Sequence, residues 1–156
     1  MPSTLELNGM PNRPPMEISE MRKRVRAAID HSQRLAAARR AEIDQAATAY
    51  ETFLAEMAEP IVQMLANALR GEGYSFKVFT PKHGLRLVSS RSDQDFIEFG
   101  LDTARHPVAV LRVSRTRGRR VMQHERTIRG EEQIDQLTEE DVVKALLEEI
   151  GPLVER

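Results

Sequence analysis

Between Glu17 and Glu59 the chain contains neither proline nor glycine, and alanine, glutamate, arginine and methionine dominate its composition. These four residues are strong helix formers, whereas proline and glycine are the residues that interrupt helices. A helix over this range would be roughly 60 Å long, because each residue adds about 1.5 Å. The stretch therefore predicts a helix too long to be covered by a small domain built from the rest of the chain.

Apolar side chains recur along the second half of this helix with alternating spacings of four and three residues. This is the a/d spacing of a coiled coil, in which the repeated positions face a partner helix. A similar pattern runs from Ile18 to Leu35, and an extra four-residue step through Arg39 joins the two registers, as in a stutter. The predicted oligomer seam comprises Ile43, Ala47, Tyr50, Leu54 and Met57.

The two halves of the predicted helix carry opposite charge. Between residues 22 and 40 there are seven basic side chains against Asp30 alone, and residues 42–59 include five acidic side chains and no basic one. Antiparallel pairing about a centre near Ala41 places basic on acidic residues, whereas parallel pairing stacks like charges. We therefore expect an antiparallel coiled-coil dimer. The alternatives are a solitary helix that lies partly on its own domain, and charged halves that are only solvated faces.

Pro60 cannot continue the hydrogen-bond ladder of a helix, so a kink or break is expected just before it. An apolar pattern from Pro60 to Arg70 predicts a second helix that ends at Gly71 or Gly73. From Tyr74 onward the apolar period changes to two, which is typical of strands. Five strands are expected at 74–79, 85–89, 95–101, 108–114 and 119–128.

The last predicted element is a helix that begins after Thr138. Thr138 is a suitable N-cap with Asp141 three residues later, and Gly151 with Pro152 is expected to end the helix. The fold class is therefore α+β, with a long N-terminal coiled-coil helix, a kinked second helix, a five-stranded antiparallel meander and a C-terminal helix. The expected domains are a disordered arm at 1–16, a coiled-coil helix at 17–59 and a small α+β domain at 60–156. A fragment from Ala58 to Arg156 is expected to stay folded.

The residues that enzymes need for catalysis are poorly represented. The chain has no cysteine, its four histidines show no metal-ligand spacing, and its glycines form no phosphate-binding loop. Asp93, Asp95, Glu98 and Asp102 bracket one predicted strand and could hold Mg²⁺, but aspartate in turns more often bonds its own backbone. We predict no catalytic residue, no cofactor and no metal.

The stretch RVSRTRGRR lies in the predicted hairpin of the fourth and fifth strands, where Thr116-Arg117-Gly118 is the expected turn. Such a cluster of like charges needs anions nearby. The acidic segment Glu131 to Asp141 could supply carboxylates from the same chain, and phosphates of a nucleic acid are the alternative. No aromatic residue accompanies the cluster, which argues against readers of single strands. The predicted basic site comprises Arg112, Arg115, Arg117, Arg119 and Arg120.

With a net charge of -1, any electrostatic function has to arise from local asymmetry. The sequence favours a non-enzymatic, homo-oligomeric protein-interaction module with a further, unidentified protein partner. A nucleic-acid-binding protein that uses the arginine hairpin and the basic first half of the long helix is the alternative, and an enzyme with a site divided between loops is third. No secretory signal or membrane-spanning run is recognisable, so we expect a cytoplasmic protein, of bacterial type.

Overall fold

The computed structural model describes residues 14–130 and 133–155. The chain divides into two compact units, residues 1–39 and residues 40–156. The predicted arm at 1–16 lies mostly outside the described residues, and the described residues 14–17 have no regular secondary structure. The boundary between the units falls between Arg39 and Arg40, whereas the sequence predicted it after Glu59.

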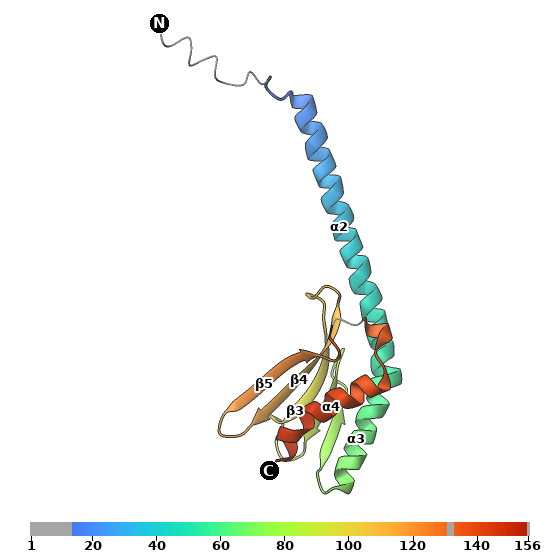
Figure 1. The fold of residues 1–156 in the computed structure, drawn as a ribbon, viewed down its shortest axis with the longest axis vertical. Coiled ribbons are helices and arrows are strands. Elements are labelled where there is room, and N and C mark those ends of the chain that lie inside the picture. The colour runs from blue at the N-terminus through green and yellow to red at the C-terminus, as the bar shows by residue number, and fades with distance from the viewer. Residues whose placement is uncertain (1–13, 131–132, 156) are drawn as a thin grey trace. The chain divides into compact units, whose positions relative to one another are not determined.

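Three successive helical elements follow one another: α2 (Ile18–Phe53), the π-helical turn η1 (Leu54–Ala58) and α3 (Glu59–Gly71) (Figure 1). The N–H of Glu59 donates to the carbonyl of Leu54, five residues earlier. In an α-helix the ring of Pro60 would clash with the carbonyl four residues before it. The π-helical turn, which is wider than an α-helical turn, lies just before Glu59 and Pro60. The interruption predicted before Pro60 thus takes the form of a π-helical turn.

The end of α3 is closed by backbone hydrogen bonds. Gly73 has a φ of 91°, a left-handed conformation that glycine adopts without steric cost. The N–H of Glu72 donates to the carbonyls of Ala68 and Leu69, and the N–H of Tyr74 returns to the carbonyl of Leu69 at 2.8 Å. The predicted termination of this helix by glycine is therefore confirmed.

The sheet is a five-stranded antiparallel meander in the order β1-β2-β3-β4-β5, so the predicted α+β class is confirmed. Each strand pairs with the next along the chain (Figure 1). The strands are β1 (Phe76–Phe79), β2 (Leu85–Ser89), β3 (Phe96–Asp102), β4 (Ala109–Arg117) and β5 (Val121–Thr127).

The hairpin between β4 and β5 turns later than the sequence predicted. Arg117 pairs with Val121, and the N–H of Gly118 donates to the carbonyl of Arg120 at 3.2 Å. The turn is therefore made by residues 118–120 instead of 116–118. Gly118 does not use the positive φ expected of it, which among the described glycines is found at Gly73 and Gly130.

The C-terminal helix α4 (Glu139–Val154) follows a short 3-10 turn, η2 (Ile134–Gln136). The predicted cap at Thr138 is confirmed: its hydroxyl accepts from the N–H of Asp141 at 3.2 Å, and the Asp141 carboxylate accepts from the N–H of Thr138 at 2.9 Å. The predicted end at Gly151 and Pro152 is wrong, because the helix runs through both. Leu153 is buried in the core, which stabilises the last turn.

One hydrophobic core joins the sheet to the helices of the second unit. Alternating residues of β2 and β3, together with one residue each of β1 and β4, supply the sheet's contribution. The helical elements α2, η1, α3 and α4 and the segment between β5 and α4 supply the rest. The fully buried side chains of this core include Tyr50, Val62, Leu87, Phe99, Val142 and Leu146.

The C-terminal part of α2 belongs to this core. Tyr50 is 2 % exposed, and its hydroxyl donates to the carbonyl oxygens of His83 at 2.8 Å and Phe99 at 3.3 Å. Burial, aided by the negative charge of Glu98, raises the pKa of Tyr50 to about 12. Phe53 packs on Phe99 with ring centroids 6.3 Å apart. A fragment that starts at Ala58 would therefore lack two core aromatic side chains.

We expect a fragment of residues 40–156 to unfold cooperatively near the temperature of the full chain, and a fragment of residues 58–156 to be unfolded or aggregated. Loss of a buried aromatic side chain costs about 3–5 kcal/mol, and loss of both would exhaust the stability of a typical domain. Thermal and urea unfolding followed by circular dichroism compares the two fragments. Equal stability of both would show that Tyr50 and Phe53 are dispensable to the core.

Candidate functional site

The predicted oligomer seam is largely used by the domain itself. Tyr50 is in the core, Leu54 and Met57 pack against it, and Ile43 and Ala47 are partly exposed. A helix needs the same apolar stripe whether it covers its own domain or a partner helix, so the spacing did not distinguish the two. Tyr50, Leu54 and Met57 thus have neighbours within the chain, and antiparallel pairing through the seam stays a prediction.

Arg112, the first residue of the predicted basic hairpin, is inside the domain. It lies on the face of β4 toward α4, and its side chain is 7 % exposed. Nη1 donates to the carbonyl of Ala145 at 3.0 Å, and Nη2 donates to the Glu148 carboxylate at 2.8 Å. Nε lies 3.6 Å from the Glu149 carboxylate without a hydrogen bond to it. A buried guanidinium with these partners joins the sheet to α4.

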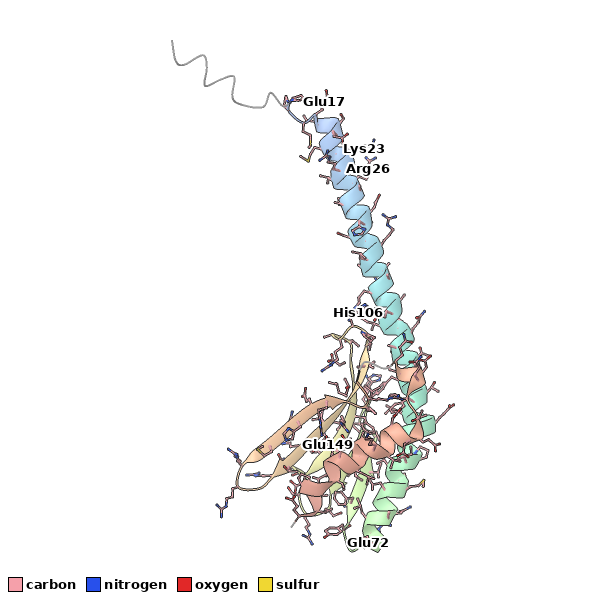
Figure 2. All side chains as sticks on the ribbon, viewed as in Figure 1. Glu17, Lys23, Arg26, Glu72, His106 and Glu149 are labelled. Atoms are coloured by element: carbon pink, nitrogen blue, oxygen red, sulfur yellow. The ribbon has the colours of Figure 1, made fainter. Side chains whose placement is uncertain are left out.

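Glu149, labelled on α4 in Figure 2, is the carboxylate at the centre of this network. It is 5 % exposed and also accepts a hydrogen bond from Arg126 of β5. That hydrogen bond and the charge of Glu149 raise the pKa of the Arg126 guanidinium. The two arginines occupy paired positions on β4 and β5, so one carboxylate reduces the repulsion between them.

A further ion pair lies at the start of α4, where Arg129 is 3.2 Å from the Asp141 carboxylate. The pKa of Asp141 is lowered, mainly by the hydrogen bond from the N–H of Thr138 and further by the Thr138 hydroxyl and Arg129. For Arg112 the carboxylates are those of Glu148 and Glu149, which belong to the acidic C-terminal part of the sequence but lie beyond residues 131–141. Residues 131 and 132 of that segment are outside the described residues.

The other four predicted arginines fall into two environments. Arg115 is half-buried on the sheet face away from the helices, opposite Phe96 in β3, and its Nε has no hydrogen-bond partner. Arg117, Arg119 and Arg120 are exposed at the hairpin end, and none forms an ion pair with a carboxylate of the residues that the structure describes. The predicted basic site is therefore divided: Arg112 is inside the domain, Arg115 is on the sheet, and the other three arginines form a positively charged hairpin end.

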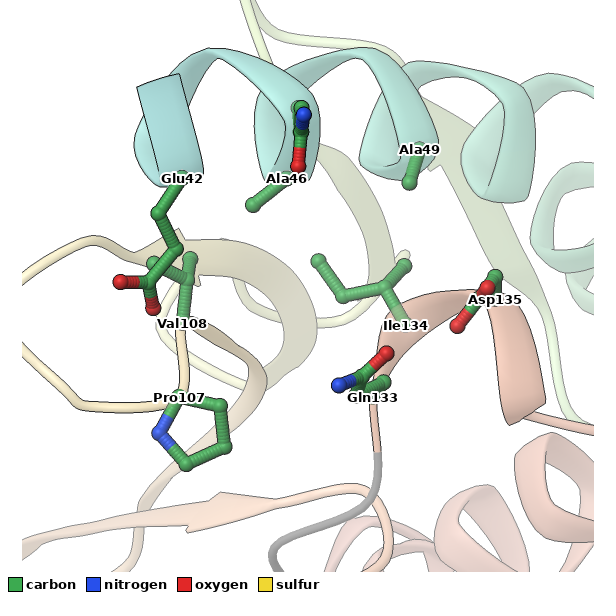
Figure 3. Close-up of a pocket in the computed structure, with 9 residues that line it drawn as sticks. Glu42, Ala46, Ala49, Pro107, Val108, Gln133, Ile134 and Asp135 are labelled. Carbon is green, nitrogen blue, oxygen red and sulfur yellow. The ribbon is translucent and has the colours of Figure 1, made fainter. Parts of the chain in front are cut away.

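A small cavity of about 220 Å³ lies between α2 and the loops before β4 and α4 (Figure 3). Glu42 and Asp135 supply its carboxylates, and His106 Nδ1 is 3.1 Å from the Glu42 carboxylate. Within residues 14–130 and 133–155, no group of three or more histidine, cysteine, aspartate or glutamate residues is arranged to hold a metal ion. The cavity is therefore a recess with two carboxylates, one of which has an imidazole beside it.

The first unit presents an apolar stripe along residues 18–35 of α2. Its large side chains are between 48 % and 73 % exposed. They recur at spacings of three and four residues, with a longer step to the last one, and Arg22 and Arg26 flank the stripe on one side. Lys23 and Arg26, labelled in Figure 2, show how densely charged this part of the helix is. The stripe comprises Ile18, Met21, Val25, Ile29 and Leu35.

The sequence matches no protein-family model, no curated protein and no solved structure. No helix in the described part of the chain is both long enough and apolar enough to cross a membrane. Functional inference therefore rests on the surfaces described above.

We expect Arg112→Met to lower the free energy of unfolding by about 3 kcal/mol, because the substitution removes one cationic neighbour of the buried Glu149 carboxylate and the hydrogen bond to Glu148. Arg119→Met is the matched control at the exposed hairpin end and should change stability by less than about 0.5 kcal/mol. Urea unfolding of the two variants and the wild type measures both values. Equal effects would show that Arg112 has no structural role.

Proposed function

We propose that this protein is a non-enzymatic protein-interaction module that self-associates through the apolar stripe of residues 18–35. A single observation carries this proposal: five large apolar side chains on one side of a helix are each about half exposed or more. Covering such a stripe stabilises the complex by about 25 cal/mol for each Å² of apolar surface removed from water. Contiguous exposed apolar surface is also characteristic of interaction sites.

A second copy of the chain is the partner that the charges favour. The stripe lies among basic residues, while the whole chain has a net charge of -1, so a second copy brings enough acidic groups to compensate for them. Most soluble oligomers consist of identical subunits. A further protein partner and a cytoplasmic location remain parts of the proposal.

Val25→Glu should convert the oligomer to a monomer at micromolar concentration, because it places a carboxylate in the centre of the buried stripe. Ala27→Glu is the control: it adds the same charge to the same exposed helix, on the side opposite the stripe. Light scattering coupled to size exclusion reports the mass of each variant. A monomeric wild type, or equal dissociation by both substitutions, would contradict self-association through the stripe.

Nucleic-acid binding is a second candidate because of the hairpin end. Arg117, Arg119 and Arg120 have no acidic partner among the described residues, and phosphates would compensate for this charge by counterion release. The basic residues around Arg22 and Arg26 would add a second contact region. Because Arg112 lies inside the domain, one arginine fewer is available to bind phosphates.

Replacing Arg117, Arg119 and Arg120 by alanine tests this candidate directly. If the hairpin binds phosphates, log affinity for duplex DNA falls linearly with log salt concentration, and the triple variant should have a less negative slope. We expect a change of about one in this slope for each lost phosphate contact. Arg70→Ala, an exposed arginine on α3, is the control and should leave the slope unchanged. On the preferred proposal the wild type shows no such salt-dependent binding, and the triple variant keeps the same oligomeric mass.

A further inference from the structure

Helices α3 and α4 enclose an apolar groove of about 290 Å³ on the surface of the second unit. The α3 wall is formed by Ile61, Met64, Leu65 and Ala68, which repeat at helical spacing along one side. Met64 is 69 % exposed, and Leu147 of the α4 wall is 56 % exposed.

The charge around this groove is acidic. Glu139 is the one charged side chain that lines the groove. Glu140 follows it on α4, with Lys144 one turn further along, and Glu72, four residues after Ala68, continues the row of the α3 wall beyond the helix end. The residue spacing places Arg70 on the opposite side of α3. The groove therefore suits an apolar segment that carries positive charge at its edge.

We propose that this groove binds the apolar stripe of a second copy, with Met21, Val25 and Ile29 as its central anchors. This inference rests on the proposed self-association and names the surface that receives the stripe. An amphipathic helix placed in a hydrophobic groove with anchors three or four residues apart is a recurrent mode of recognition. Arg22 and Arg26, which flank the stripe on one side, would face Glu139 and Glu140.

The lengths of the two surfaces correspond. The α3 wall from Ile61 to Ala68 extends about 11 Å, and the α4 wall from Glu139 to Leu147 about 12 Å. Met21 to Ile29 covers about 12 Å of helix, or slightly more than two turns. The groove thus accommodates the middle of the stripe.

Pairing of two stripes with each other is less favourable than docking in the groove. In antiparallel orientation, facing stripes would bring Arg22 and Arg26 of one copy near the same arginines of the other. Like charges across a helix interface are destabilising, whereas the groove offers carboxylates to the same arginines. The charge pattern therefore favours a stripe-to-groove contact between copies.

Disulfide crosslinking tests this contact in the full chain, which has no native cysteine. Val25→Cys protein is mixed with Met64→Cys protein that carries a tag of different mass, and the mixture is oxidised at micromolar concentration. We expect at least about tenfold more mixed disulfide than in a mixture of Val25→Cys with Gln63→Cys, because docking raises the effective thiol concentration to the millimolar range. Gln63 is the matched control, since it is exposed on α3 beside Met64 but outside the groove.

The outcomes separate this inference from the proposed function. If Val25→Cys crosslinks mainly to itself while the oligomer depends on Val25, self-association stands and docking in the groove is wrong. A wild type that is monomeric by light scattering overturns both. If a chain with both Val25→Cys and Met64→Cys closes its disulfide as a monomer, the occupant is the same chain and the proposed second copy is wrong.

A charge in the groove provides a test that needs no crosslink. Met64→Lys should weaken self-association to the extent that Val25→Glu does, because it places a positive charge against the basic stripe. The exposure of Met64 predicts an unchanged melting temperature, in contrast to a substitution in the core. Self-association at wild-type strength in the folded Met64→Lys protein would overturn docking in the groove.

Discussion

The position of Tyr50 determines how the long helix relates to the rest of the second unit. Its ring is in the core, and its hydroxyl bonds the carbonyls of His83 and Phe99, which belong to the loop before β2 and to β3. A phenol can satisfy both requirements at once, since it offers a large apolar ring and a donor at its far end. The residues of α2 after Arg39 are therefore part of the domain, and the stripe before Arg39 is exposed among the residues that the structure describes.

The Arg112 network has a similar role on the other side of the core. The guanidinium donates hydrogen bonds to the backbone of α4 and to Glu148 and lies within ion-pair distance of Glu149, so the helix is held at a defined position on β4. Breaking such a buried pair is costly even where the intact pair contributes little net stability. An arginine cluster in the sequence thus contains one member whose role is internal, while the arginines at the hairpin end remain available to solvent.

The sequence was sufficient to predict the type and order of most elements. The meander followed from strand periodicity, and the start of α4 followed from Thr138 and Asp141, because these signals are local. The environment of Tyr50 was not predictable in this way. An apolar residue at helical spacing indicates that a side of the helix is covered, but the covering element is set by tertiary packing. The same reason explains why Arg112 and Arg119 looked equivalent in the sequence.

Two surfaces of this chain are apolar, exposed and of opposite surrounding charge: the stripe of residues 18–35 and the groove of α3 and α4. A stripe with basic flanks cannot pair with an identical stripe without repulsion, and an acidic groove cannot pair with an identical groove for the same reason. Each surface is instead complementary to the other in apolar character, in length and in charge. Charge that disfavours like-with-like contacts while favouring unlike ones gives specificity by the same means as designed and natural coiled coils. In the proposed docking, the asymmetry of charge along the chain would select between two possible contacts and would favour the contact of stripe with groove.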